Sequence, residues 1–359
     1  MTESAKALGH LKTARAGASR AAAGPRKHTV TLVAGDGVGE EVAEAVVKLI
    51  EAMGVSLGWD RQAAGQKALS RDATPVPPAL VRSIMEHKIA LKGRLTAPAG
   101  GPGEPPSVAL RRALGIYASV RPARSLAGLK SRYDRLDLVV IRESTEDLYA
   151  GIEHEVVPGV VESLKVVTQA ACDRIAAFAF DYAGRHGRRC VTAVHKANIM
   201  KLTDGLFLEC CRQAASQHPG IEYREMIADN CMMQLVLDPR QFDVLVMENM
   251  LGDIVSDLCA GLVGGLGTVP AINIGPNVAM FEAIHGNAPH LEGQDLATPL
   301  PMITAAAAML EHLGEAGAAG RLMAATSRVL SEGRALTPDL GGTSHTSEMT
   351  QAIIGALEG

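Results

Sequence analysis

A strand, a glycine turn and a helix follow one another directly near the start of the chain, and this order strongly constrains the fold. Residues 28–35 form an apolar, β-branched run, the turn reads GDGVG, and residues 40–53 have helical apolar spacing with acids in the first turn. Such a βα unit is typical of a mostly parallel sheet. Residues 136–143 and 241–249 read as buried strands that end in polar residues. We therefore expect an α/β fold with its chemistry at the carboxyl ends of the strands.

The glycine turn does not match the dinucleotide-binding fingerprint G-x-G-x-x-G. A standard Rossmann nucleotide site is therefore not indicated. Near the other end of the chain, an Ala-rich segment at residues 300–314 and the final segment at residues 346–359 are both expected to be helices.

Length and composition indicate a soluble globular enzyme. The chain has 359 residues, 47% of them hydrophobic and 21% charged, so it is long enough for two domains. A net charge of −4 gives no overall attraction to nucleic acid or to an anionic membrane. No apolar run approaches the roughly 18 to 20 residues that span a bilayer. We expect neither a nucleic-acid partner nor a membrane.

The cysteines and the N-terminal segment bear on the cellular compartment. The six cysteines show no CxxC pair and no metal-ligand spacing, which favours reduced, buried thiols and a cytoplasmic location. Residues 1–28 are rich in Ala, Lys, Arg and Ser, with Glu3 as the single acid. We prefer a flexible basic arm here; the same composition fits a transit peptide, which would place the protein in an organellar matrix.

Asp253 and Asp257 are the clearest candidates for metal ligands. They lie in the run MENMLGDIVSD, one helical turn apart, and would repel each other unless a positive group lay between them. Mg²⁺ and Mn²⁺ prefer such oxygen ligands and leave positions open for a substrate. An isolated pair of this kind is more often a solvated acidic helix face, but other motifs accompany this one.

Those motifs carry a family resemblance. They read TLVAGDGVGEEV at 31–42, VVIRESTEDLYAGIEHEVV at 139–157, VHKANIMKLTDGLFLECC at 194–211 and IADNCMMQLV at 227–236. On these motifs, the chain from residue 29 onward resembles the β-decarboxylating dehydrogenases, which include isocitrate, isopropylmalate and homoisocitrate dehydrogenases. It is most similar to the NAD-dependent isocitrate dehydrogenase branch.

The resemblance implies an isocitrate/isopropylmalate dehydrogenase-like fold. A large discontinuous parallel-sheet domain would comprise residues 29–116 and 264–359, and a smaller α/β domain with a dimer clasp would comprise residues 117–263. It further implies a homodimer, or an assembly of dimers, in which each active site takes groups from both subunits.

The resemblance also assigns the chemistry. Arg111, Arg121 and Arg142 would bind the carboxylates of a 3-substituted malate, since guanidinium forks suit carboxylates. The metal would be held by Asp253, Asp257 and, from the neighbouring subunit, Asp229. Lys196, also from the neighbour, would be the general base, and Tyr149 the acid that reprotonates the enol.

For the cofactor, HGNAP at residues 285–289 resembles the family's adenosine loop. The cofactor-binding residues that this implies are Thr96, Glu104, Asn198, Glu282, His285, Gly286, Ala288 and Thr298. Of these, Thr96 and Asn198 would touch the nicotinamide end of the cofactor. The positions that meet the 2′-phosphate in NADP-specific relatives are His290, Leu291, Pro338 and Gly342, which offer little positive charge. NAD is therefore the expected cofactor.

The loop that reads the third substituent of the substrate departs from the isocitrate pattern. It reads Glu104-Pro105-Pro106-Ser107, and Pro105 donates no hydrogen bond where relatives place a serine. Ser107 is the remaining hydroxyl for substrate binding. Isocitrate is the leading substrate, with isopropylmalate, homoisocitrate and phosphonomethylmalate as alternatives. A non-catalytic regulatory subunit is a further alternative, opposed by the retained metal and acid–base residues.

Overall fold

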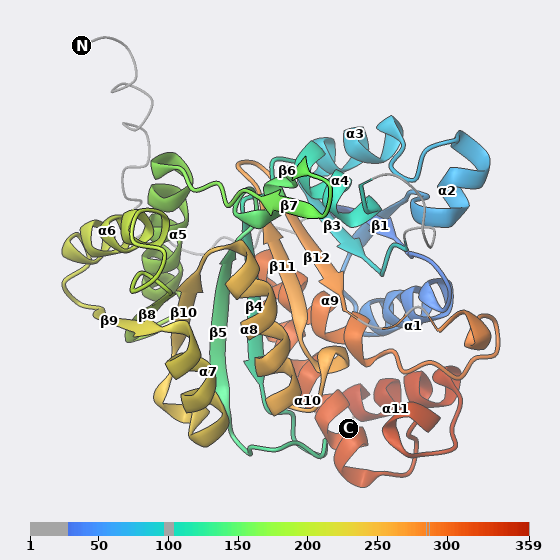
Figure 1. Cartoon of the computed structure of the whole chain (residues 1–359). Coiled ribbons are helices and arrows are strands. Elements are labelled where there is room, and N and C mark those ends of the chain that lie inside the picture. Colours follow the sequence, from blue (N-terminus) through green and yellow to red (C-terminus); the bar gives the residue numbers. More distant parts are fainter. Residues whose placement is uncertain (1–27, 97–103, 285, 287, 359) are drawn as a thin grey trace, which may run out of the picture.

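A ten-stranded sheet runs through the whole molecule and carries helices on both faces (Figure 1). The computed structural model describes residues 28–96, 104–284, 286 and 288–358. The strand order is β2-β1-β3-β12-β11-β4-β5-β10-β8-β9. The strands of this sheet are β1 (His28–Val33), β2 (Leu57–Arg61), β3 (Ile89–Lys92), β4 (Ala118–Arg124), β5 (Asp137–Glu143), β8 (Cys190–His195), β9 (Glu222–Ile227), β10 (Val244–Met247), β11 (Pro270–Ile274) and β12 (Ala279–Ala283).

The two flanks of the sheet are parallel and its centre is antiparallel. Strand β11 runs antiparallel to both β12 and β4, and β4 runs antiparallel to β5. The other neighbouring pairs are parallel. The expected α/β fold with a mostly parallel sheet is confirmed.

Helices cover both faces at both ends of the sheet. Near β1, helices α1, α9, α10 and α11 share one hydrophobic cluster, and α3 and α4 share another. Near β10, α5 and α6 pack on one face and α7 and α8 on the other. The helices are α1 (Gly39–Ala52), α2 (Gly65–Asp72), α3 (Pro78–His87), α4 (Pro106–Ala113), α5 (Gln169–Arg185), α6 (Thr203–Ser216), α7 (Ala228–Leu237), α8 (Asn249–Leu262), α9 (Leu300–His312), α10 (Ala316–Glu332) and α11 (Thr346–Glu358).

Strand β5 shows why residues 138–141 form an uninterrupted apolar run. Val139 and Ile141 enter the core beneath α5, whereas Leu138 and Val140 enter the core beneath α8. Side chains alternate between the two faces of a strand, and both faces are covered here. Each fully buried aliphatic side chain contributes about 1.5 to 3 kcal/mol.

The expected elements are present with small shifts at their ends. The predicted strand over residues 241–249 is shorter, because β10 ends at Met247 and α8 begins at Asn249. The cause is a capping contact from a distant segment: Asp147 accepts a hydrogen bond from the Met250 amide at 2.8 Å. The expected basic arm lies outside the described residues, apart from His28, which begins β1.

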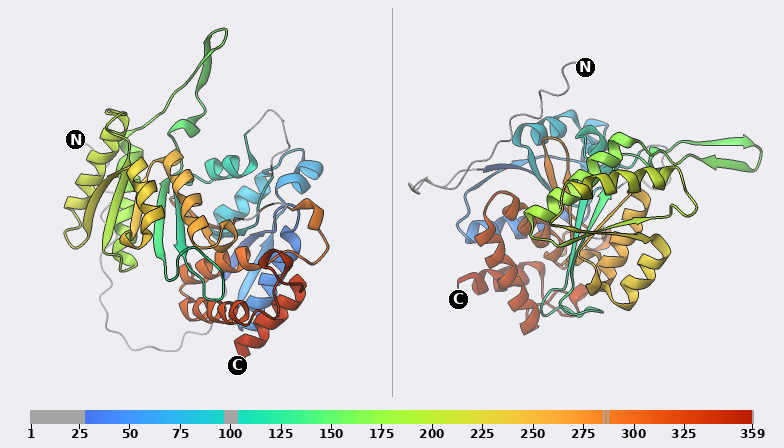
Figure 2. Two further views of the ribbon diagram at one scale, coloured as in Figure 1. Left: turned by 60° about the horizontal axis from the view of Figure 1, so that its bottom comes forward. Right: turned by 90° about the vertical axis from the view of Figure 1, so that its left-hand side faces the viewer.

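A separate hairpin projects from the body of the molecule (Figure 2). It consists of β6 (Glu153–Val157) and β7 (Val160–Ser163), and every residue of both strands is exposed. An isolated two-stranded hairpin is only marginally stable in water.

The cysteine prediction is confirmed, since all six cysteines are buried and unpaired. Within the part of the chain that the structure describes, there is no helix both long and apolar enough to cross a bilayer.

Helix α8 can lie close to β5 because residue 252 is a glycine. A Cβ atom at Gly252 would lie 2.6 Å from both Cβ and Cγ of Arg142, which is far inside van der Waals contact. The glycine thus lets the Arg142 side chain leave β5 beneath the first turns of α8. It sets the distance between that strand and the helix that carries Asp253.

We predict that Gly252→Ala lowers the free energy of unfolding by about 1 to 3 kcal/mol, the usual cost of overpacking. Gly261→Ala, in the same helix but with open space around the added methyl, is the matched control. It should be neutral or stabilise by up to about 1 kcal/mol through helix propensity. Urea unfolding of both variants measures the difference, and equal effects would refute the packing argument.

Candidate active site

Arg142 is the centre of the site, at the carboxyl end of β5. Its Nε donates to Asn249 Oδ1 at 2.9 Å, and its Nη1 forms an ion pair with Asp253. The Arg142 side chain is only 4% exposed, and burial lowers its pKa, while Asp253 opposes that shift. The neighbouring helix therefore supplies the charge that a buried guanidinium requires.

Tyr149 reaches the same carboxylate from the turn η1 (Leu148–Ala150). Its hydroxyl donates to Asp253 Oδ2 at 2.5 Å, and Arg142 Cζ lies 5.0 Å from the centre of the ring. Asp147 fixes this turn, because its side chain accepts from the amides of Leu148 and Met250, each at 2.8 Å. The φ angle of Asp147 is +73°, a strained conformation that the two hydrogen bonds maintain.

Two of the three predicted substrate arginines line one cavity, and the third is close enough for its charge to interact with theirs. A cavity of about 120 Å³ is lined by Arg111 of α4, Arg142 and Tyr149. Arg121 projects from β4, and its Nε donates to Ser119 Oγ at 3.2 Å. Burial lowers the pKa of Arg121 to about 10, and the charges of Arg142 and Arg111 add to that effect. Positive charge crowded in this way favours a ligand with several carboxylates.

Asp253 and Asp257 lie one turn apart on α8, as predicted. The pKa of Asp257 is raised, first by burial and then by the charge of Asp253. A divalent cation would relieve this repulsion, and carboxylate oxygens are the ligands that Mg²⁺ and Mn²⁺ prefer. No group of three or more acidic, His or Cys side chains suited to a metal occurs within the described residues of one chain. A single chain thus offers two of the three predicted ligands.

The third predicted ligand, Asp229, pairs with Lys196 instead. Lys196 Nζ lies 2.6 Å from Asp229 Oδ1 in the first turn of α7, and this ion pair lowers the pKa of Asp229. Lys196 directly follows β8. Lys196 and Asp229 therefore pair with each other, and within the described part of one chain Asp229 does not join Asp253 and Asp257 in a group of metal ligands.

Distance across the sheet separates the two residues predicted at the nicotinamide end of the cofactor. Thr96 follows β3, whereas Asn198 follows β8, six strands further along the sheet. At about 4.8 Å per strand this is roughly 29 Å. Within one chain, these two residues do not meet at one ring.

The remaining cofactor candidates lie around β3 and β12. The Thr96 amide donates to Asp36 Oδ2 at 2.8 Å, which anchors it to the glycine turn. Glu282 Oε1 lies 2.5 Å from the ammonium of Lys92, a fully buried lysine on β3. Thr298 Oγ1 accepts from the Leu300 amide at 3.3 Å in the first turn of α9.

In the adenosine-like loop, Gly286 is exposed and Ala288 has a left-handed φ of +38°. His285 lies outside the described residues. In the divergent loop, Glu104 forms an ion pair with Arg112 at 2.9 Å, and Ser107 lies in the first turn of α4.

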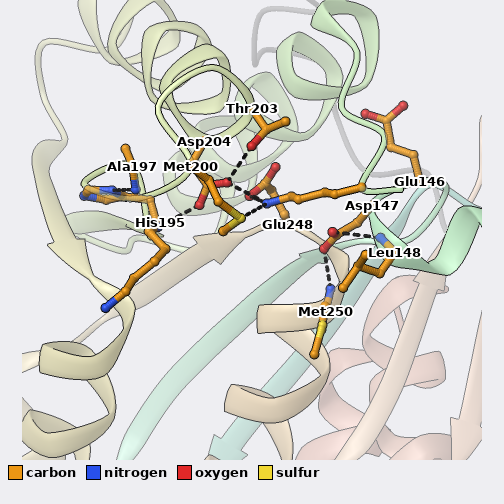
Figure 3. Close-up of polar contacts among 12 residues, drawn as sticks. Glu146, Asp147, Leu148, His195, Ala197, Met200, Thr203, Asp204, Glu248 and Met250 are labelled. Atoms are coloured by element: carbon orange, nitrogen blue, oxygen red, sulfur yellow. Dashed lines mark hydrogen bonds and ion pairs between the residues drawn. The ribbon is translucent and has the colours of Figure 1, made fainter. Parts of the chain in front are cut away.

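The sequence analysis assigns no role to several charged residues that are buried or nearly so. Lys92 and Lys165 lie outside the quoted motifs, whereas Asp147, Asp204 and Glu248, labelled in Figure 3, lie inside them. A further signal was position, since Lys92 ends β3 and Glu248 directly follows β10. Polar residues at the ends of apolar strands point to such roles.

The geometry defines an α/β protein with an arginine-lined cavity and a carboxylate pair at the carboxyl edge of an open sheet. The family described as isocitrate/isopropylmalate dehydrogenase matches residues 29–353. The chain therefore belongs to the isocitrate/isopropylmalate dehydrogenase family.

Individual relatives are similar over most of their length. Isocitrate dehydrogenase (NAD) catalytic subunit 5, mitochondrial, from Arabidopsis thaliana is 48% identical, over 90% of this chain and 87% of that protein. The chloroplastic 3-isopropylmalate dehydrogenase of Solanum tuberosum is 46% identical, over 85% of each chain. The crystal structure of isocitrate dehydrogenase from Methylococcus capsulatus superposes with a TM-score of 0.87 at 48% identity, covering 92% of this chain and all of the other.

We predict a pH-dependent stability that originates at Glu248. Burial raises the pKa of this carboxyl to about 8, although Lys165 lowers it. The folded state then holds the proton more tightly than the unfolded chain, so the free energy of unfolding falls as pH rises from about 5 to 8. In Glu248→Gln this dependence should flatten, as measured by Tm across that range. Glu332→Gln, on an exposed turn of α10, should keep the wild-type slope; equal slopes in all three proteins would contradict the assignment.

Proposed function

We propose that this protein catalyses the NAD- and metal-dependent oxidative decarboxylation of isocitrate to 2-oxoglutarate. The observation that carries the proposal is the convergence of Arg142, Tyr149 and Asp253 beside Arg111 and Arg121. The names of the Arabidopsis and Methylococcus relatives support the substrate and the first of them supports the cofactor.

The three arginines would hold the carboxylates of the substrate and fix its hydroxyl-bearing carbon. Arg142 is preset for this role, because Asn249 and Asp253 restrain two of its nitrogens. Ser107, in the first turn of α4, would meet the third substituent. Guanidinium forks held in place lose little freedom when the ligand binds.

Asp253, Asp257 and the Asp229 carboxylate of a second copy would hold Mg²⁺ or Mn²⁺. Such a cation, when bound, stabilises the negative charge that develops as carbon dioxide leaves. Bound NAD⁺ would supply the acceptor for the hydride that leaves the hydroxyl-bearing carbon. Lys196 of the second copy would remove the hydroxyl proton, and Tyr149 would return a proton to the enol carbon.

Two observations support a dimer with shared sites. Lys196 and Asp229 pair with each other and belong to no group of three potential metal ligands within the described part of one chain. Apolar side chains are exposed just before α6, at the end of α7 and on α8: Leu202 at 90%, Leu237 at 65% and Ile254 at 46%. A partner that covers these helices would bury them. The exposed hairpin of β6 and β7 would be the clasp.

The proposed domain division follows the hydrophobic clusters. The clusters that contain α1 and α3 draw their buried residues from outside residues 117–263, and the cluster that contains α5 draws them all from inside that range. The cluster beneath α8 adds Val269 alone from beyond it. This supports a large domain of residues 29–116 and 264–359 and a small domain of residues 117–263.

The cofactor preference and the cellular location are also proposed. The four positions that meet the 2′-phosphate in NADP-specific relatives carry no lysine or arginine; they are His290, Leu291, Pro338 and Gly342. Asp339, which follows Pro338, adds a negative charge and accepts a hydrogen bond from the Thr298 amide at 3.4 Å. This environment opposes a 2′-phosphate and favours NAD. The composition of residues 1–28 left an organellar matrix open as an alternative to the cytoplasm. The name of the Arabidopsis relative contains the word mitochondrial, which supports the organellar matrix as the location of this protein.

We predict that isocitrate gives the highest kcat/KM in a panel that also contains isopropylmalate, homoisocitrate and phosphonomethylmalate. The absorbance of NADH with Mg²⁺ present is the measurement, with NADP⁺ in parallel as the cofactor control. Turnover of another member alone would make the loop at residues 104–107 the specificity determinant and reject isocitrate. Silence across the whole panel would support a regulatory subunit.

We predict that two inactive variants restore activity when combined. Lys196→Ala and Asp253→Asn should each abolish turnover as homodimers, because each damages both sites. A mixed dimer holds one site with both defects and one intact site. Refolding an equal mixture should therefore recover about one quarter of wild-type activity, since about half of the dimers are mixed. Mixing Asp253→Asn with Asp257→Asn is the control and should recover nothing, because both changes affect the carboxylates that a chain keeps for its own site.

A further inference from the structure

Lys165 lies where three functional segments meet, just beyond the end of β7. Its ammonium lies 2.6 Å from Asp204 Oδ1 and 2.6 Å from Glu248 Oε2. Figure 3 labels these two acids. The Lys165 side chain is 14% exposed, and both carboxylates are buried. A single cation thus bridges two acids in a region of low dielectric, where its removal has the greatest effect.

Asp204 connects the ammonium to the main chain of Lys196. Its second oxygen, Oδ2, accepts a hydrogen bond from the Lys196 amide at 2.7 Å. Asp204 is completely buried in the first turn of α6, and its Oδ1 also accepts from Thr203 Oγ1 at 3.2 Å. The position of the Lys196 backbone is therefore set by the same carboxylate that Lys165 neutralises.

Glu248 connects the ammonium to α8. It directly precedes the first residue of that helix, whose next turns carry Asp253 and Asp257. Its other oxygen, Oε1, is buried and has no hydrogen-bond partner among the described residues. The contact with Lys165 is consequently the main polar restraint on this side chain.

The residue after Lys165 adds a second connection to the same helix. Val166 and Asp147 pair through two main-chain hydrogen bonds. In the shorter one, the Asp147 amide donates to the Val166 carbonyl at 2.8 Å. Asp147 in turn accepts from the Met250 amide and precedes the turn of Tyr149. The base of the hairpin, the Tyr149 turn and the start of α8 are thus joined at one point.

We propose that Lys165, with Asp204 and Glu248, is a positioning cluster that couples the two active sites of a dimer. The inference rests on the proposed function, in which Lys196 acts in the partner's site while Asp253 acts in its own. Through Lys165, the backbone that presents Lys196 to one site is tied to the helix that forms the other. None of the three side chains contacts a reacting atom in this proposal.

The physical basis is the balance of charge. Without the ammonium, the buried Asp204 carboxylate would have no cation beside it, and Glu248 Oε2 would lose the hydrogen bond that Lys165 donates to it. Both side chains would then move, whether or not Glu248 carries its proton. Displacing Asp204 releases the Lys196 amide, and displacing Glu248 releases the start of α8. A neutral residue at position 165 should therefore disturb both segments together.

The mixed dimer of Lys196→Ala and Asp253→Asn chains isolates these two effects. Its one intact site uses Asp253 of the chain that carries Lys196→Ala and Lys196 of the chain that carries Asp253→Asn. Lys165→Met can be placed on either chain, and dimers carrying two affinity tags can be purified and assayed. We expect kcat to fall roughly 10- to 100-fold with either placement, the range for residues that orient catalytic groups, with KM for isocitrate changed less than about threefold.

Controls separate this effect from general damage. Arg188 also bridges two carboxylates, those of Asp137 at 2.5 Å and Asp243 at 2.9 Å, and is similarly buried, but it lies at the opposite ends of the strands. Arg188→Met should leave kcat of the intact site within about twofold of the parent. Lys165→Arg keeps the charge and should recover part of the loss. If Lys165→Met prevents folding, Lys165→Gln, whose amide still donates, should show a milder loss with the same dependence on placement.

The outcomes are distinct. A loss with both placements supports the coupling. A loss with only one placement, or with neither, while the parent mixed dimer is active, overturns the coupling and leaves the proposed function in place. An inactive parent mixed dimer overturns the shared site, and the coupling with it.

Discussion

The close approach of α8 to β5 is the constraint on which the rest of the site depends. Gly252 permits it, and Arg142 leaves the strand directly beneath the helix. Because of that approach, one guanidinium reaches Asn249 and Asp253, and Tyr149 reaches the same aspartate from the other side. A larger residue at position 252 would separate the substrate arginine from the proposed metal carboxylate. The glycine of the run GDIVSD therefore contributes to the geometry of the site, in addition to the two aspartates.

Charge is arranged differently in the two parts of the site. Arg111 and Arg142 line the cavity, and Arg121 is close enough for its charge to interact with theirs, so a ligand with several carboxylates would complete the balance. Behind it, each buried cation is already matched: Lys92 with Glu282, and Lys165 with Asp204 and Glu248. Such matched pairs contribute little net stability compared with apolar residues, but they restrain geometry when every member is bound. The first arrangement suits binding, and the second suits positioning.

The sequence predicts the α/β class, the first strand, turn and helix, and the helical spacing of Asp253 and Asp257, because these depend on local periodicity and apolar runs. It does not predict that β4 and β11 join the two halves of the chain into one sheet, since pairing between distant strands has no local signature. Likewise, the end of β10 depends on Asp147, about a hundred residues away in the chain. Lys165 and Asp204 were missed for the same reason: their partners are brought together only by folding. The resemblance to a family identified the residues that carry the chemistry, but not those that hold them in place.

The continuity of the ten-stranded sheet has a mechanical consequence. The two proposed domains share hydrogen bonds between β4 and β11, so they are not joined by a free linker. Opening or closing the cleft between them must be absorbed as twist and bending of this antiparallel centre, spread over several strands, because no single residue there can rotate freely. The restoring force of the sheet would then act on every closure. The enzyme would return to one resting geometry after each turnover without any dedicated latch.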